Sequence, residues 1–538
     1  MRSGFHFGLV FAAIFVVVFL LHVPLLHLPY FWDEGGYYVP AARDLLLDGS
    51  LIPHTTVSNA HPPLVMAWVA LWWKVAGFAP LVTRSAMLVI AAFSLFGLFR
   101  LTERVANTEV AIGSTVCCAL YPVFFAQSSL AQVDLAAAGL TFWGLFAYIE
   151  DRPIATAVWF SLAALAKETA ILAPVALAGW EFSSFILPKR AWITSYWRDG
   201  SGRWLRRMLP LLFSLLPLVA WYVYHYARTG YVFGNPEFFR YNVASTLNPL
   251  RFLLALLLRL WQTFGYLHLW LLTLTMIVAM SILPIRDGGI ERRKILVPVQ
   301  ALFFVVIAAY VCAMALIGGA VLARYMLTSV PLVIVLAVAT LRRRLRYWKI
   351  AVAGIAVAFV LAWFWNPPYG FSPEDNLAYR DYTYLHLDAE QFVEARYPMA
   401  HVLTAWPASD ELARPWLGYI TRPVQVVRIE DFSLEQVLSA ADFRSHFEVA
   451  LVFSTKYEPG HPLLDSAKTW IDLKRRFFGY HRDLPPAAAA QILGGHIVFS
   501  EERNGQWAAV IELERDEMQN AGALGREIIS ASNDMNAF

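Results

Sequence analysis

Long apolar runs constrain the fold of this chain more than any other feature. Eleven of them approach the ~20 residues that a helix needs to cross a bilayer, at residues 8–27, 82–100, 109–127, 133–149, 154–170, 171–187, 208–227, 262–284, 296–317, 325–341 and 350–365. Hydrophobic residues make up 58% of the 538 residues, against roughly 45–50% in a typical soluble chain. The sequence therefore predicts a polytopic α-helical membrane protein with about 11 transmembrane helices.

Charge predicts the orientation of these spans, because cytoplasmic loops are rich in Lys and Arg. The first run meets HLPYFWDE rather than a small-residue cleavage site, which indicates an uncleaved first helix with a cytoplasmic N-terminus. Eleven spans then place three basic connections inside the cell. The first contains Lys189, Arg190, Arg198, Arg203, Arg206 and Arg207, the second Arg292, Arg293 and Lys294, and the third Arg342, Arg343, Arg344, Arg346 and Lys349. We expect a multi-pass protein of the cell (inner or plasma) membrane. The net charge of +3 gives no reason to expect a nucleic-acid partner.

The same threading leaves a large first outer loop, from residue 28 to about 80. Within it, PAARDLL and PPLVMAWVALWWKVAG are typical of helices at the membrane interface, with Trp68, Trp72 and Trp73 as anchors. The segment 228–261, which contains Phe238, Phe239 and Arg240, is expected either at the same surface or as part of a span.

The composition becomes polar at NPPYGFSPED, from residue 366. We therefore predict a transmembrane domain at 1–365, an extracytoplasmic α/β domain at 366–515, and a polar, disordered tail at 516–538. Strands are expected at MAHVLTAW, RPVQVVRI, FEVALVFS and HIVFSEE, and helices at SLEQVLSAADF and SAKTWIDLKRRFF.

Ionisable residues from distant parts of the sequence gather at the outer ends of the predicted spans. They are Asp33, Glu34, His54, His61, Arg84, Asp134, Lys167, Glu168 and Arg324. A charge at the centre of a membrane helix costs roughly 2.5–3.5 kcal/mol on insertion scales, so charges kept at membrane depth are candidates for function. Any one of them alone also fits an ordinary interfacial charge, but the set is harder to explain that way.

Carboxylates can act as general bases or bind cations, whereas His, Lys and Arg can hold a phosphate. The motif HPPL at 61–64 places His61 beside a helix start, where Pro is favoured and an anion is stabilised. A simple helix start with an interfacial histidine is the alternative explanation.

Two segments of the first loop, "YFWDEGGYYVPAARDLLLDGSLIP" and "HPPLVMAWVALWWKVAGFAPLVTRSAM", resemble the first outer loop of GT-C superfamily glycosyltransferases that use polyprenyl-phosphate sugars. This group includes the protein O-mannosyltransferases and the lipid A aminoarabinose transferase. "QVDLAAAGLTFWGLF", "LAALAKETAILAPVAL" and "ARYMLTSVPLVIVLAV" continue the similarity in the same order, over about residues 8 to 345.

The resemblance implies a GT-C-like fold with its active site at the outer membrane face. Asp33 falls on the acidic motif and would be the catalytic base, with Glu34 as its partner and Asp134 as the acidic residue of the second loop. Lys167 and Arg324 fall on basic positions that face the lipid phosphate, and Arg84 and His61 are further candidates to bind the donor phosphate. The chain departs from the pattern at Ala60 and His61, where these transferases commonly have Glu and Lys.

The expected activity is transfer of a sugar from a polyprenyl-phosphate donor to a hydroxyl of a lipid, glycan or protein acceptor, with inversion at the anomeric carbon. A divalent metal held by Asp33, His61 and Asp134 is a further expectation. Two other activities remain open: a transporter or flippase of lipid-linked glycans, and a ligase or polymerase that uses diphosphate-linked donors.

Overall fold

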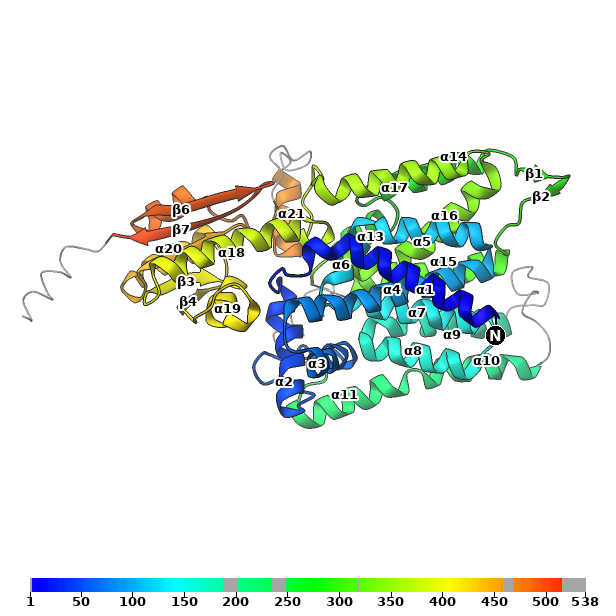
Figure 1. Cartoon of the computed structure of the whole chain (residues 1–538), viewed down its shortest axis with the longest axis horizontal. Coiled ribbons are helices and arrows are strands. Elements are labelled where there is room, and N and C mark those ends of the chain that lie inside the picture. Colours follow the sequence, from blue (N-terminus) through cyan, green and yellow to red (C-terminus); the bar gives the residue numbers. More distant parts are fainter. Residues whose placement is uncertain (1, 187–200, 235–247, 318, 458–467, 515–538) are drawn as a thin grey trace, which may run out of the picture. The chain divides into compact units, whose positions relative to one another are not determined.

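The computed structural model describes residues 2–186, 201–234, 248–317, 319–457 and 468–514 (Figure 1). These form two compact units, one of Met1–Arg380 with Glu458–Tyr480, the other of Asp381–Tyr457 with His481–Phe538. The division after Arg380 falls later than the predicted domain boundary after residue 365. The predicted disordered tail, 516–538, lies outside the described residues.

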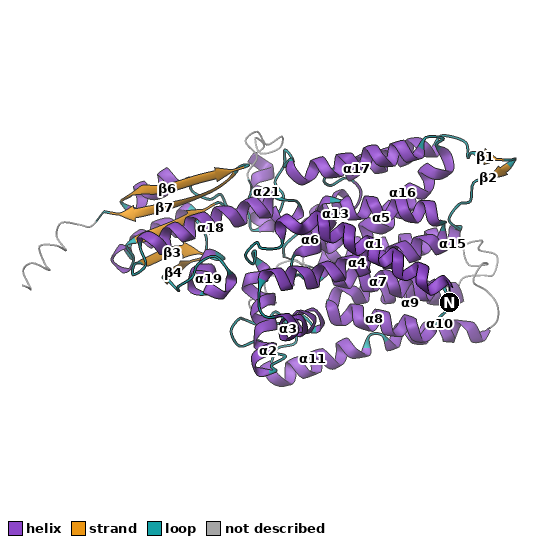
Figure 2. Ribbon diagram, in the orientation of Figure 1, coloured by secondary structure: helices purple, strands orange, loops and turns teal. Residues whose placement is uncertain are grey.

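The first unit is built of helices (Figure 2), and most of them lie on the predicted apolar runs. They are α1 (Arg2–His22), α2 (Val39–Asp48), α3 (Leu64–Ala76), α4 (Pro80–Val105), α5 (Thr108–Leu120), α6 (Pro122–Ser129), α7 (Asp134–Ile149), α8 (Pro153–Ala166), α9 (Leu172–Ile186), α10 (Ser201–Phe213), α11 (Leu216–Thr229), α13 (Pro249–Phe264), α14 (Leu269–Met280), α15 (Val297–Leu316), α16 (Ser329–Arg344), α17 (Trp348–Phe364) and α21 (Lys468–Phe478), with a small hairpin of β1 (Arg286–Asp287) and β2 (Ile290–Glu291).

Four described segments are long and apolar enough to cross a membrane, namely Phe7–Leu25, Pro80–Val105, Trp204–Thr229 and Val297–Leu316. Two bent helix pairs, α5 with α6 (69°) and α13 with α14 (77°), raise that number to six if each pair is one span. Several other predicted spans appear as shorter apolar helices, such as α7, α8 and α17. The chain is therefore multi-pass, while the count of eleven stays a prediction.

The predicted span 262–284 contains a break that the sequence analysis did not place. Helix α13 ends at Phe264, α14 begins at Leu269, and the residues between them include Leu267 and His268 in left-handed backbone conformations. Residues 249–261 of the predicted outer segment 228–261 thus belong to helix α13. Phe238, Phe239 and Arg240 lie outside the described residues.

The two helices expected in the first loop are present as α2 and α3. Trp73 does not suit the role of membrane anchor, because it is 2% exposed and its indole N–H donates to Thr83 Oγ1 (2.8 Å). Trp68 donates to the Ala86 carbonyl (3.0 Å). These tryptophans fix α3 to α4.

The second unit contains a five-stranded sheet in the order β4-β3-β5-β7-β6 (Figure 2). Strands β3 (His401–Ala405), β4 (Gln425–Ile429) and β5 (Val449–Phe453) are parallel neighbours, and β6 (Gly495–Arg503) and β7 (Gln506–Leu513) form an antiparallel hairpin beside β5. Helices α18 (Ala378–Arg396, beginning in the first unit), α19 (Ala408–Ala413), α20 (Leu434–Ala441) and α22 (Pro486–Leu493) accompany them. The four predicted strands are β3 to β6. The predicted helix at 466–478 is α21, which belongs to the first unit.

Close packing of α4 against α7 depends on Gly139. A Cβ at this position would lie 1.8 Å from Ser94 Oγ and 2.9 Å from the Ser94 Cα. Small residues allow membrane helices to approach in this way. We expect Gly139→Ala to destabilise the protein by about 1–3 kcal/mol through overpacking, measured as a lower Tm in detergent. Gly179→Ala is the matched control, since a Cβ there meets nothing within 4 Å. Equal Tm values for the two variants would contradict this packing.

Candidate functional site

Arg324 joins four segments of the first unit. It lies in the short 3-10 helix η6 (Ala323–Met326) and is 3% exposed. Its Nη2 donates to Asp33 Oδ2 (2.5 Å), and its Nη1 donates to Gln132 Oε1 (2.6 Å) and to Glu374 Oε2. Its Nε lies 3.4 Å from Asp134 Oδ2. One guanidinium thus holds three carboxylates and one amide.

Lys167 adds a second cation to this cluster. Its Nζ donates to Asp134 Oδ1 and lies 4.1 Å from the centroid of the Tyr325 ring. Lys167 follows the end of α8 in an extended conformation, and Asp134 is the first residue of α7. The predicted residues Asp33, Asp134, Lys167 and Arg324 are therefore brought together by helix ends, where side chains need not follow one helix face.

Asp33 is the accessible carboxylate of the cluster. Its side chain is 20% exposed, whereas those of Asp134 and Glu374 are 4% and 3% exposed. Among the described residues, the hydrogen bond of the Asp33 carboxylate is made by Oδ2, to Arg324. A carboxylate that is fixed by one oxygen and still reached by solvent suits proton transfer with an entering molecule.

The backbone around Asp33 is irregular. Trp32 has a φ of 47°, in the left-handed region, and Glu34–Tyr38 form a π-helical turn, η2. Such turns are frequent at functional sites, and a non-glycine residue in the left-handed region costs free energy that its surroundings must offset. Gly35 and Gly36 of the EGGYY sequence are both buried in this turn, where the lack of a side chain helps it to pack.

Glu34 and Arg84 pair with each other, whereas Asp33, Asp134 and Lys167 gather around Arg324. Both side chains are fully buried, and Arg84 Nη1 donates to Glu34 Oε1 (2.5 Å). Glu34 also accepts the backbone N–H groups of Phe31 (2.9 Å) and Ala131 (2.5 Å), while Arg84 donates to the carbonyls of Pro29 and Ser129. Neither side chain is reached by solvent. Together they fasten the start of the first loop to α4 and to the residues after α6.

His61 lies in a separate contact with Glu168. Its Nδ1 is 2.7 Å from Glu168 Oε2, and its ring stacks on Tyr38 at 5.9 Å. The preceding Ala60, with a φ of 58°, turns the chain, and its carbonyl accepts from Trp221 Nε1 (2.9 Å). A small pocket beside His61 is lined by Tyr37, Tyr38, Ala41, Asn59, Met66 and Trp221, among others.

The predicted metal set of Asp33, His61 and Asp134 is not assembled. A search of the described residues for converging metal ligands does not group these three. The reason is electrostatic: each already has an oppositely charged or hydrogen-bonding partner, Arg324 for Asp33, Glu168 for His61, and Lys167 for Asp134. The donors do not fit a metal at this place.

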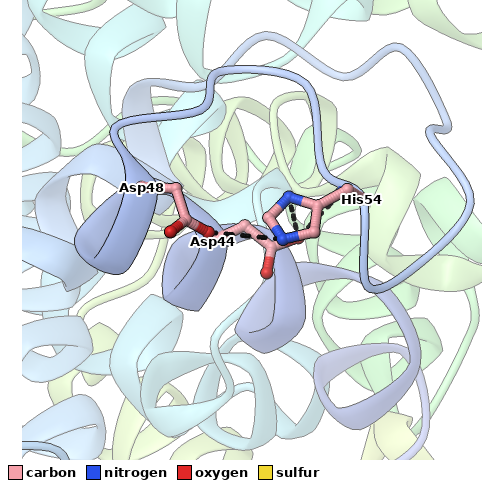
Figure 3. Close-up of side chains that lie close together, drawn as sticks. All are labelled: Asp44, Asp48 and His54. Atoms are coloured by element: carbon pink, nitrogen blue, oxygen red, sulfur yellow. Dashed lines mark hydrogen bonds and ion pairs between the residues drawn. The ribbon is translucent and has the colours of Figure 1, made fainter.

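The first loop carries an acidic cluster of a different kind. His54 lies close to both Asp44 and Asp48 (Figure 3): its Nδ1 is 3.5 Å from Asp44 Oδ2, and its Nε2 is 3.3 Å from Asp48 Oδ2. Asp44 is buried and accepts from the backbone N–H groups of His54 (2.8 Å) and Thr55 (2.9 Å) and from the Thr55 hydroxyl. Asp44 thus holds the loop against α2.

Glu374 is the principal site residue that the sequence analysis missed, with Gln132 beside it. Gln132 Nε2 donates to Glu374 Oε2 (3.1 Å), so the two support each other as well as Arg324. Arg259 of α13 is also buried and donates to the carbonyls of Met314 and Leu322. The available signal for Glu374 was the pair of adjacent acids in SPED. This motif follows the last apolar run as FWDE follows the first.

No family model matches the sequence, and no curated protein is significantly similar to it. Solved structures share its fold. ArnT from Cupriavidus metallidurans bound to undecaprenyl phosphate superposes with a TM-score of 0.55 at 13% identity, over 95% of this chain and 98% of that one. The apo form gives 0.53 at 14% identity, over 94% and 98%. The archaeal oligosaccharyltransferase AglB from Archaeoglobus fulgidus, at a TM-score of 0.46, 10% identity and coverages of 94% and 74%, is too distant to argue from.

The chain therefore has the fold of ArnT, and the predicted GT-C-like fold is confirmed. At these identities the likeness establishes the fold alone.

The burial of Glu34 predicts a structural effect of its substitution. Glu34→Gln leaves Arg84 charged and unpaired in the interior, and breaking such a pair costs about 3–5 kcal/mol. We expect a large fall in Tm and in yield from membranes. Glu103→Gln is the control, because its pair with Arg100 is partly exposed and worth about 0–1 kcal/mol. A Glu34→Gln protein with the Tm of the parent would contradict this role.

Asp375 makes stability depend on pH. Burial, and then the charge of Glu374, raises the pKa of Asp375 to about 8, while the Tyr266 hydroxyl donates to its Oδ2 (2.6 Å). Since the folded pKa lies above the ordinary value, this group's contribution to stability is complete in acid and is lost as the pH rises through 8. We expect the Tm of Asp375→Asn to rise relative to the Tm of the parent as the pH is raised from 5 to 8. A Tm difference that is constant with pH would contradict the assignment.

Proposed function

We propose that the chain is a membrane glycosyltransferase that moves a sugar from a polyprenyl-phosphate donor to an acceptor hydroxyl outside the cytoplasm. The observation that carries the proposal is the partly exposed Asp33, fixed by Arg324 in a buried cluster that also holds Lys167, on the fold of ArnT. That neighbour's structure contains undecaprenyl phosphate, which supports a donor of the same lipid-phosphate class.

In the proposed reaction, Asp33 accepts the proton of the acceptor hydroxyl while the acceptor oxygen bonds to the anomeric carbon. The bond between that carbon and the phosphate oxygen breaks, its electron pair stays on the oxygen, and polyprenyl phosphate leaves. A single displacement of this kind inverts the anomeric centre.

Arg324 and Lys167 would stabilise the charge that develops on the leaving phosphate, which is typically the largest electrostatic contribution in such a site. Both cations are now neutralised by carboxylates of the cluster. A phosphate would therefore replace part of that carboxylate contact as it binds. We assign Asp134 and Glu374 to positioning these cations, and His61 with Glu168 to a supporting contact at the donor side.

Substitution of Asp33 tests this proposal. Asp33→Asn keeps the size of the side chain and removes the base, so we expect transfer to fall by at least about 10²-fold, in the range of general base catalysis. The assay supplies purified protein with a panel of undecaprenyl-phosphate sugars and outer-envelope acceptors, and binding of undecaprenyl phosphate should persist. Asp48→Asn, in the same loop and 56% exposed, is the control.

Two outcomes would contradict the assignment. Full transfer by Asp33→Asn would remove Asp33 as the base. Movement of the lipid-linked sugar across the bilayer, with no transfer by the parent protein to any acceptor, would favour the flippase alternative.

A further inference from the structure

A second cluster of ionisable side chains lies in the other unit. His386 and Glu390 are one helical turn apart on α18, and Glu411 lies on α19. All three side chains are buried, with exposures of 2%, 0% and 1%. Their ligand atoms lie within 4.8 Å of one another.

The charges of this cluster are not balanced. The ion pairs of Glu390 and Glu411 within the described part of the chain are both with His386, whose Nδ1 lies 2.6 Å from Glu411 Oε2 and 3.5 Å from Glu390 Oε1. Two buried carboxylates thus share one imidazole. Uncompensated buried charge is strongly unfavourable, so the cluster must either take up a proton or bind a cation.

Glu390 supplies an independent observation. Its side chain is fully buried, and among the described residues neither carboxylate oxygen has a hydrogen-bond donor other than the neighbouring Glu411 carboxyl, which could donate only if it were protonated. The Nε2 of His386 and the Oε1 of Glu411 are likewise buried without a hydrogen bond. Buried polar atoms normally have partners, so these indicate that something is bound between the side chains.

Two aromatic rings pack against the imidazole of the cluster. The Tyr382 ring stacks on the His386 ring with centroids 4.1 Å apart, and the Phe453 ring lies edge-on at 4.4 Å. Aromatic walls of this kind fix the imidazole and lower the local dielectric, which strengthens any interaction between the carboxylates and a cation.

We propose that His386, Glu390 and Glu411 bind a divalent metal ion, with Zn²⁺ the best match. One imidazole nitrogen and two carboxylate oxygens are a Zn²⁺ ligand set, and small rotations would bring the atoms to the about 2.0–2.2 Å that Zn²⁺ requires. The ion fastens α19 to α18. Three protein ligands leave a fourth position of the tetrahedron, which a water molecule would complete.

A proton shared by the two carboxylates is the competing explanation. Burial and then the charge of Glu411 raise the pKa of Glu390 well above its usual value, which describes the cluster without a metal. The two explanations predict opposite effects of Glu390→Gln. If the two carboxylates share a proton, the amide of Glu390→Gln takes the place of the protonated acid, and the stability changes little or rises. If they bind a metal, the same substitution removes a charged ligand and the metal is lost.

The test uses the full chain purified in detergent. We expect elemental analysis to find a single Zn²⁺ per chain, or the chelator-treated protein to take up one on addition of Zn²⁺, with a rise in Tm of several degrees. Glu390→Gln and Glu411→Gln should lose both the bound Zn²⁺ and the Tm response. Asp48→Asn, in the exposed cluster of Figure 3, should keep both.

Two results would overturn the proposal. The first is a parent protein that holds no zinc and shows no Tm response to Zn²⁺ after chelation. The second is a Glu390→Gln protein that binds Zn²⁺ as the parent does. If that variant fails to fold, Co²⁺ replaces Zn²⁺ in the parent, where a visible absorption band of tetrahedral Co²⁺ is expected and an octahedral, solvent-like spectrum would reject the site.

Discussion

The guanidinium of Arg324 is the interaction on which the candidate site depends. It is buried, and it is the point at which the residue before η2, the residues before α7 and the segment after α17 meet. A buried cation without partners would cost much free energy of folding, so the carboxylates around Arg324 are required for stability as well as being candidates for chemistry. Asp33 differs from the other partners in its exposure. The same electrostatic constraint therefore assembles the candidate site and leaves Asp33 as its accessible carboxylate.

The sequence predicted the membrane class, the large first loop and four of the five strands of the second unit's sheet, because these depend on local patterns of hydrophobicity. It missed β7, although Asn504 and Gly505 form the two-residue turn that joins β6 to β7, and Asn-Gly is a strong hairpin signal. It also placed a continuous span across the bend between α13 and α14. Nothing local marks that bend beyond Gly265, since both sides are apolar.

For the site, sequence position predicted which ionisable residues gather but not which of them face a substrate. Asp33, Asp134, Lys167 and Arg324 do meet, whereas Glu34 and Arg84, which have the same chemistry and similar positions, are buried as a closed pair. Partner choice depends on side-chain geometry in three dimensions. Glu374 shows the converse, since a residue assigned to the α/β domain of 366–515 belongs to the centre of the cluster.

The Glu34–Arg84 pair also has a consequence for how the protein is made. During synthesis Glu34 leaves the ribosome well before Arg84, so the first loop must reach the membrane surface with its buried acid still unpaired. The loop can take its final conformation only once α4 has been inserted, because Arg84 lies in that helix. Insertion of α4, and not of the first helix alone, therefore gives Glu34 its ion-pair partner.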